Sequence, residues 1–166
     1  MAEALAVRIR QARPEDLPAL EWGGEYRRFR RVYRQALAEA RAGRRLILLA
    51  EVGGAVVGQV LAQLSPPDAG GAASPSAHLH ALRVMPDYRN QGLGTRLLDQ
   101  AEAELRRRGY RRVSIAAGIN NAAARRLYER LGYAVVRTDP GEWSYVDEQG
   151  RTRVEAEPAY IMQKEL

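Results

Sequence analysis

The chain contains no cysteine, and this absence excludes several kinds of chemistry. Without thiols there are no disulfides, no thiolate nucleophile and no cysteine-ligated metal. Histidine is also scarce, because the only two imidazoles belong to His78 and His80. A site built from two or three histidines is therefore not expected, and we predict no bound metal.

Long hydrophobic runs are absent too. No apolar stretch approaches the roughly 20 residues of a membrane-spanning helix, and residues 1–11 lack an apolar core followed by a small-residue cleavage site. We therefore expect a cytoplasmic protein with no membrane partner. With 166 residues, of which 46% are hydrophobic and 28% charged, the chain has an ordinary globular composition, and its length predicts a single domain over 1–166.

Acidic residues are fewer than basic ones, so the net charge is +6. Lys164 is the one lysine among the basic residues. A basic chain is compatible with a nucleic-acid partner or an anionic substrate. Apart from 106–108 and 111–112, however, the arginines are scattered. We therefore expect no tight binding of duplex DNA.

Hydrophobic periodicity predicts alternating strands and helices. Strands are expected at 7–11, 46–52, 56–64, 78–84, 113–117, 133–138 and 159–163, and helices from Pro14, over 26–42, over 93–105 and over 124–131. Gly53 and Gly54, between two apolar runs, predict a hairpin. The order favours an α/β (α+β) domain whose mixed sheet has at least one parallel pair. Residues 65–76, rich in Pro, Gly, Ser and Ala, predict a mobile loop.

One strand-to-helix turn has the features of a phosphate site. The strand ends at Val84, Pro86 cannot continue the ladder, and a helix opens near Gly92. Gly92 and Gly94 leave room for backbone N–H groups to approach a ligand, and a helix N-terminus favours an anion. Arg89 adds a full positive charge. A third glycine, as in the dinucleotide fingerprint, and the Gly-Lys-Ser/Thr of a Walker loop are both missing.

Three segments together resemble the GNAT acetyltransferase superfamily. Val84-x-Pro86-x-Tyr88 followed by Arg89-x-x-Gly92-x-Gly94 closely resembles its acetyl-CoA-binding motif. Asn121, Ala124, Leu127, Tyr128 and Leu131-Gly132-Tyr133 resemble its Asn-x-x-Ala-x-x-Leu-Tyr…Leu-Gly-Phe helix, with Tyr133 in place of the common Phe. Residues 8–16 resemble its first strand and helix start. In order and spacing the resemblance spans nearly the whole chain.

The resemblance implies a GNAT-like mixed central sheet of about seven strands flanked by about four helices. A splayed parallel strand pair, 78–84 and 112–117, would hold coenzyme A. It also implies acetyl-CoA as acyl donor and transfer to a primary amine of a small molecule or peptide. The implied cofactor contacts are Leu82, Arg83, Val84, Arg89, Asn90, Gln91, Gly92, Leu93, Gly94, Thr95, Asn121 and Tyr128.

The catalytic groups are less completely defined by the resemblance. Tyr128 would lie near the thioester sulfur as an acid or hydrogen-bond donor, and a purely core aromatic is the alternative. His80 is a candidate base, because a histidine pKa suits neutral pH; a packed core histidine is the alternative. Glu51 is a second candidate, and deprotonation by solvent is a third. The branch that acetylates protein N-termini has an acid at the position of Ala116, which argues against that activity here.

Two segments are expected to build the acceptor side. Residues 21–30 and 139–158 place acids beside aromatics, a combination that suits a cationic amine, although a solvated loop is the alternative. Two other functions stay open: a non-catalytic CoA-binding sensor or partner module, and an acetyltransferase acting on aminoacyl-tRNA or protein N-termini. The sequence also leaves open whether the chain forms a homodimer.

Overall fold

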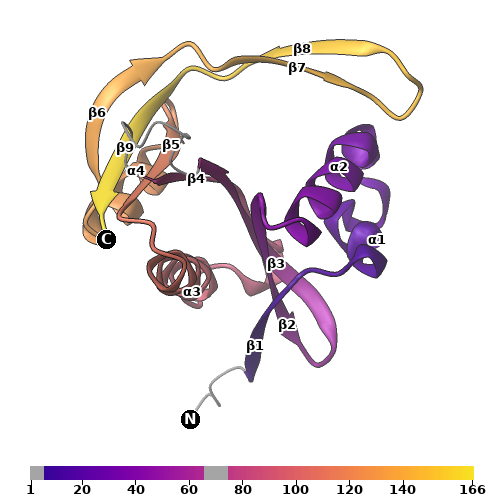
Figure 1. The fold of residues 1–166 in the computed structure, drawn as a ribbon, viewed down its shortest axis with the longest axis horizontal. Coiled ribbons are helices and arrows are strands. Elements are labelled where there is room, and N and C mark those ends of the chain that lie inside the picture. Colours follow the sequence, from indigo (N-terminus) through magenta and orange to yellow (C-terminus); the bar gives the residue numbers. More distant parts are fainter. Residues whose placement is uncertain (1–5, 66–74) are drawn as a thin grey trace.

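A twisted seven-stranded sheet organises the protein, with the strand order β1-β2-β3-β4-β5-β9-β6 (Figure 1). The computed structural model describes residues 6–65 and 75–166, so most of the predicted loop at 65–76 lies outside the described residues. The strands are β1 Val7–Gln11, β2 Arg45–Val52, β3 Ala55–Ser65, β4 Ser76–Val84, β5 Arg112–Gly118, β6 Ala134–Asp139 and β9 Ala159–Glu165. Among the strands of the described residues, β4 and β5 are the one pair that runs parallel, which confirms the predicted mixed sheet.

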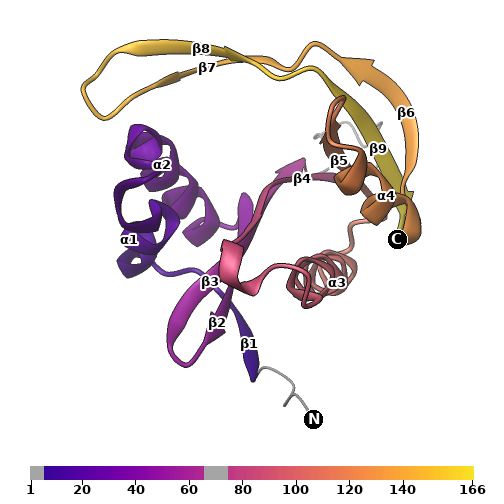
Figure 2. The ribbon, with the colours of Figure 1, turned by 180° about the vertical axis from the view of Figure 1, so that it is seen from behind.

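Helices cover both faces of this sheet, and Figure 2 shows α1 and α2 on the opposite side of β2–β4 from α3. The α-helices are α1 Leu17–Leu20, α2 Arg30–Arg41, α3 Leu93–Arg107 and α4 Ala122–Arg130. Short 3-10 turns are η1 Pro14–Asp16, η2 Trp22–Gly24, η3 Arg27–Phe29 and η4 Pro86–Tyr88. In the described parts of the chain, no helix is both long and apolar enough to cross a membrane.

The two core layers follow from the helix stripes. Leu97, Leu98, Ala101 and Leu105 of α3 are buried in one cluster with alternate residues of β2, β3, β4 and β5. Tyr33, Ala36 and Leu37 of α2 are buried with the β2 and β3 residues that point the other way. Each fully buried leucine contributes about 1.5–3 kcal/mol relative to exposure. The sheet therefore separates two hydrophobic cores, one on each of its faces.

A β-bulge interrupts β4 where the site lies. The pairing with β3 shifts register between Gln59 and Leu61, and Ala81 adopts a positive φ of 53°. Because of this extra residue, Leu79 and Leu82 both join the core cluster on the α3 side, although they are three residues apart. Parallel pairing of β4 with β5 begins at Ser76 and stops at Leu79, so the two strands separate from His80 onward.

The segment expected as an acceptor-side loop is a long hairpin. β7 Glu142–Val146 and β8 Thr152–Ala156 form a separate two-stranded sheet that extends from β6 and β9 across to α2 (Figure 1). These strands escaped prediction because they pair only with each other and lie outside the main sheet. Their aromatic residues, Trp143 and Tyr145, pack on Phe29, far away in the sequence.

Candidate functional site

A cleft of about 500 Å³ opens on the α3 side of β4, beside the gap between β4 and β5. Its walls come from the end of β4, the turn into α3 and the exposed side of α4. The lining residues are Leu82, Val84, Tyr88, Arg89, Asn90, Gly92, Leu93, Gly94, Thr95, Asn121, Ala123, Ala124, Leu127, Tyr128 and Arg130.

The turn into α3 presents free backbone N–H groups to this cleft. Asn90 and Gly92 have positive φ values of 60° and 81°, which turn the chain sharply before the helix. The first intrahelical hydrogen bond runs from the Arg96 amide to the Gly92 carbonyl over 3.0 Å. The amides of residues 93–95 therefore have no acceptor within the helix, and they lie where the helix dipole favours an anion. A Cβ built on Gly94 would meet no atom within 4 Å, so its side faces open space.

The edge of β4 supplies a second set of backbone groups. The Met85 amide donates to the Val57 carbonyl over 2.8 Å, so this residue uses its hydrogen-bonding groups toward β3. The backbone N–H and C=O groups of successive residues in a strand point to opposite sides. Those of Leu82 and Val84 therefore point toward the gap left by β5. Nε of Arg89 donates to the Val84 carbonyl over 2.9 Å. An extended ligand can hydrogen-bond along this edge as an added strand does.

α4 closes the cleft with a buried tyrosine. Asn121 caps the helix by accepting a hydrogen bond from the Ala124 amide over 3.1 Å. One turn further on, Tyr128 is buried with its ring 6.1 Å from that of Tyr133. The Tyr133 hydroxyl donates to Oε2 of Glu102 over 2.9 Å, whereas Tyr128 lines the cleft. Burial raises the pKa of the Tyr128 phenol, so its hydroxyl keeps its proton at neutral pH.

A second cavity, of about 540 Å³, lies across the sheet between α2, β4 and the hairpin. It is lined by Tyr26, Arg28, Phe29, Val32, Tyr33, Ala36, Arg45, Leu61, Gln63, His80, Ala81, Arg83, Trp143, Glu155 and Glu157. The Phe29 ring lies 5.7 Å from that of Trp143 and 6.3 Å from that of Tyr26. The structure thus brings together the two segments, 21–30 and 139–158, that were expected on the acceptor side.

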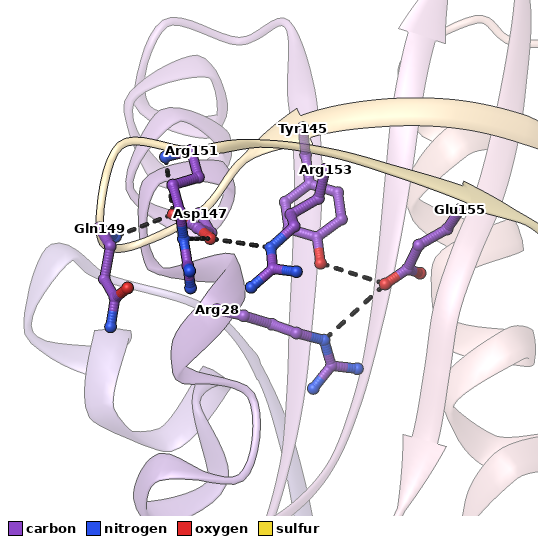
Figure 3. A network of polar contacts seen from close by, with 7 residues as sticks. All are labelled: Arg28, Tyr145, Asp147, Gln149, Arg151, Arg153 and Glu155. Atoms are coloured by element: carbon purple, nitrogen blue, oxygen red, sulfur yellow. Dashed lines mark hydrogen bonds and ion pairs between the residues drawn. The ribbon is translucent and has the colours of Figure 1, made fainter.

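A polar network at the hairpin tip holds β7 and β8 in place over η3 (Figure 3). The buried Asp147 carboxylate accepts hydrogen bonds from the amides of Gln149 and Arg151 and from Nε of Arg153, over 2.8 to 3.0 Å. Burial alone would raise the pKa of Asp147, but these amides and guanidiniums outweigh it and hold the pKa at about 2.

The same hairpin is tied directly to η3. Glu155 accepts a hydrogen bond from the Tyr145 hydroxyl over 3.1 Å, and its carboxylate lies 3.9 Å from Nε of Arg28 (Figure 3). The ring of Tyr145 also lies 4.9 Å from that of Phe29, so both apolar and charged contacts join the hairpin to η3. The hairpin therefore forms a fixed wall of the second cavity.

Three residues proposed from the sequence lie elsewhere than expected. The side chain of Arg83 lines the second cavity, on the opposite face of β4 from the cleft. Gln91 is exposed and donates through Nε2 to the Asp87 carbonyl over 3.3 Å, and it does not line the cleft. Glu51 accepts from Nε of Arg10 over 2.6 Å and lines neither space.

His80 lines the second cavity, but its surroundings are unfavourable for a general base. Nη1 of Arg45 lies 2.9 Å from Nε2 of His80, and because a guanidinium can only donate, the imidazole lone pair is engaged. Burial and then the charge of Arg45 lower the pKa of His80 to about 4. The geometry therefore argues against the catalytic role considered from the sequence.

Some lining residues were not identified from the sequence. Tyr88 and Arg130 line the cleft, and Tyr33, Arg45 and Gln63 line the second cavity. Arg130 follows Ala123 by seven residues, a helical spacing that places both on one face of α4. That spacing could have identified the arginine as a partner for an anion in the cleft.

A cleft at a strand-to-helix turn, beside a parallel strand pair that separates, is the arrangement that the sequence resemblance predicts for an acetyltransferase. Residues 8–133 match the Acetyltransferase (GNAT) family, and the chain belongs to that family.

Individual relatives agree with this assignment. An uncharacterized N-acetyltransferase of Methanocaldococcus jannaschii is 39% identical over 57 residues, which are 34% of this chain and only a quarter of that protein. The PaiA N-acetyltransferase of Thermoplasma acidophilum, solved with coenzyme A, has 18% identity and a TM-score of 0.73, with 98% of this chain and 100% of that chain covered. The ribosomal-protein-S18-alanine N-acetyltransferase of Escherichia coli has 26% identity and a TM-score of 0.70, with 96% of this chain and 93% of that chain covered. These structures share the seven-stranded mixed fold.

Proposed function

We propose that this protein is an acetyl-CoA-dependent N-acetyltransferase whose acceptor is a primary amine bound in the cavity between α2, β4 and the β7–β8 hairpin. One observation carries this proposal: consecutive residues of β4 line different spaces. Leu82 and Val84 line the cleft, and Ala81 and Arg83 line the cavity, beside the point where β4 leaves β5. A donor and an acceptor bound on the two faces would meet at this gap.

The cleft fits coenzyme A in its chemistry. The free amides of residues 93–95 and the guanidiniums of Arg89 and Arg130 would hold the pyrophosphate, since a helix N-terminus and arginine both favour phosphate. The backbone groups of Leu82 and Val84 would pair with the amides of the pantetheine arm. When bound, acetyl-CoA supplies the acetyl group as a reactive thioester.

Tyr128 would act at the sulfur. A phenol with a pKa of about 10 is a weaker acid than a thiol with a pKa of about 8.5, and burial raises the pKa of Tyr128 further. Complete proton transfer from the phenol is therefore uphill. We propose that the hydroxyl donates a hydrogen bond to the sulfur, whose developing charge such a bond stabilises.

The acceptor amine must lose a proton before it attacks. For an amine of pKa about 10.4, deprotonation at pH 7 costs roughly 4.6 kcal/mol. His80 is engaged by Arg45, and Glu51 by Arg10. We propose that water takes this proton, so kcat/KM should keep rising with pH toward the pKa of the amine, without a plateau near pH 6.5.

A protein N-terminal amine is a second candidate acceptor. It is supported by the 26% identity to the ribosomal-protein-S18-alanine N-acetyltransferase of Escherichia coli over 96% of this chain. Against it, the position expected to carry an acid in that branch is Ala116, an exposed residue of β5. We therefore rank it below the small amine.

The test is an acetyl-CoA reaction followed by mass spectrometry against small amines, peptides with free N-termini and aminoacyl-tRNA. We expect a mass increase of one acetyl group on at least one small amine. A Gly94→Val variant, which fills the cleft, serves as the matched inactive control. Binding of acetyl-CoA without transfer to any acceptor would indicate a sensor module and contradict the proposal.

A further inference from the structure

Three arginines line the acceptor cavity, and two of them are neutralised by carboxylates. Nη2 of Arg45 lies 2.8 Å from Oε2 of Glu39, and Nε of Arg28 lies 3.9 Å from Oε1 of Glu155. The third, Arg83, forms no ion pair with any carboxylate in residues 6–65 and 75–166. Glu157, which also lines the cavity, forms no ion pair with the described residues either. Arg83 is therefore a guanidinium that none of the described carboxylates contacts, although the cavity as a whole also carries a free carboxylate.

The surroundings of Arg83 hold this guanidinium in place. Its central carbon lies 3.6 Å from the centre of the Tyr26 ring and 5.4 Å from that of Trp22. Nη2 donates to the Tyr33 hydroxyl. Nε is buried and has no hydrogen-bond partner among the described residues. The aromatic faces that would attract a cationic ligand are thus occupied by the protein's own arginine.

Such a charge is costly without a partner. Arg83 is half-buried and its Nε is fully enclosed; an enclosed donor without a hydrogen-bond partner is unfavourable, and stacking on aromatic rings offsets only part of that cost. Backbone strain lies next to it, since Trp22, which packs on Arg83, has a positive φ of 51°. Strain of this kind persists at ligand sites where the surrounding structure maintains it.

The position of Arg83 limits how far an anionic group bound to it can be from the reacting amine. Arg83 is two residues beyond Ala81, the bulge residue at the gap between β4 and β5. Two residues along a strand span about 7 Å. An amine at the gap and an anion at Arg83 would therefore belong to one small molecule, separated by few bonds.

Resting on the acetyltransferase function proposed above, we infer that Arg83 binds the carboxylate of the acceptor, which is a free amino acid or a close analogue. The rings of Phe29 and Trp143, stacked 5.7 Å apart on the opposite wall, would contact an apolar or aromatic side chain. Alkyl polyamines lack the carboxylate that Arg83 would bind, so we expect them to be poorer acceptors.

The test compares matched acceptors that differ only in the acid. Wild-type protein is assayed with acetyl-CoA and apolar amino acids, their decarboxylated amines and their methyl esters, for example phenylalanine, phenethylamine and phenylalanine methyl ester. We expect the free acid to have the highest kcat/KM. In Arg83→Met, kcat/KM for the amino acid should fall by about 10- to 100-fold, the range expected for a lost hydrogen bond to a charged group. The value for the decarboxylated amine should stay the same or rise.

Controls separate the role of Arg83 from folding. Arg34→Met removes an exposed arginine from the same side of the molecule. It should leave kcat/KM unchanged for both the amino acid and the decarboxylated amine. Arg83→Lys restores charge without the planar fork and should recover part of the loss. The rise in Tm with acetyl-CoA should persist in Arg83→Met, because the donor cleft lies across the sheet.

The outcomes distinguish this inference from the function on which it rests. Equal kcat/KM for the acid, the ester and the decarboxylated amine, or faster acetylation of a peptide N-terminus, would overturn the inference and leave the acetyltransferase intact. If acetyl-CoA binds and no amine is acetylated, the proposed function fails. The inference is then decided by binding alone: amino acids must raise the Tm of the wild type and not that of Arg83→Met.

Discussion

Nη1 of Arg45 donates a hydrogen bond to Nε2 of His80 over 2.9 Å, which fixes the tautomer of a histidine at the acceptor cavity. Since Nε2 accepts, the ring proton of the neutral form resides on Nδ1. The contact joins β2 to β4 across β3. The contact therefore connects two strands of the sheet and also affects the pH at which His80 binds a proton.

His80 should make the stability of the protein depend on pH. Its pKa is lowered from 6.5 to about 4 by burial and by Arg45. Between these pH values the unfolded chain binds the proton and the folded protein does not, so stability falls as pH drops through this window. In His80→Gln this loss should be smaller, as measured by urea unfolding at pH 7 and pH 5.

His78 provides the comparison for that experiment. Its pKa is also lowered, mainly by burial, and its ring lies 6.3 Å from that of His80. His78→Gln should remove its own, separate share of the pH dependence. An unfolding curve for His80→Gln with the same pH dependence as the wild type would show that His80 titrates normally in the folded protein.

Gly94→Ala should separate donor binding from folding. A Cβ at this position meets no atom within 4 Å, and alanine favours helix over glycine, so the Tm of the free protein should not decrease. The methyl group would occupy space that a phosphate needs. Wild-type protein should gain about 2.7 kcal/mol of stability at 100 times the Kd of acetyl-CoA. We expect Gly94→Ala to lose most of this gain.

The matched control for Gly94→Ala is Asp99→Ala, an exposed position further along α3. It should keep the full rise in Tm, which differential scanning fluorimetry measures. A normal response to acetyl-CoA in Gly94→Ala would place the pyrophosphate away from this turn.

Tyr128→Phe should slow acetyl transfer and leave donor binding nearly unchanged. The variant keeps the buried ring and deletes only the hydroxyl. A loss of about 10- to 1,000-fold in kcat is expected for one acid or one hydrogen bond in the transition state. KM should change little. Wild-type turnover in this variant would reduce Tyr128 to a core residue, and Tyr128→Ala would then cost about 3 kcal/mol of stability.

Tyr133→Phe offers a contrast one turn away. The Tyr133 hydroxyl donates to buried Glu102, which also accepts from Nζ of Lys164 over 2.7 Å. Its removal should lower the free energy of unfolding by about 1–3 kcal/mol, because a buried carboxylate loses a donor. The rate per folded molecule should stay the same.

Asp147→Asn should loosen the hairpin and weaken acceptor binding. The pKa of Asp147 is held at about 2, below its ordinary 3.8, so its contribution to stability is complete above pH 3.8 and is lost as pH falls toward 2. The variant removes the charge that pairs with Arg151 and Arg153 at all pH values. We expect faster hydrogen exchange over 142–156 and a higher KM for the amine, with unchanged binding of acetyl-CoA.

Most of the fold, and most of the residues that line the cleft beside α3, could be predicted from the sequence because their signals are local. The leucine stripe of α3 and the apolar runs of β2 and β3 on either side of Gly53 and Gly54 placed the elements to within a few residues. The two glycines and Arg89 marked the turn where free amides gather. These features depend on neighbours in the chain, which a sequence pattern contains.

The acceptor side depends on contacts between distant residues, and its details were not predictable. Regular alternation along β4 would place Arg83 on the same face as Leu79, but the bulge at Ala81 reverses that order. The partner of His80 is on β2, and the hairpin takes its position from Phe29. No pattern within one segment encodes these pairings.

Because β4 separates the proposed donor site from the proposed acceptor site, selection can act on the two sites independently. Substitutions on η2, α2 or the hairpin alter the shape and charge that the acceptor meets, while the amides of the turn and the edge of β4 remain as they are. A lineage carrying this fold can thus exchange one amine for another through a few side-chain replacements without rebuilding its acetyl donor site. The same property makes the protein a practical starting point for engineering acyl transfer to chosen amines.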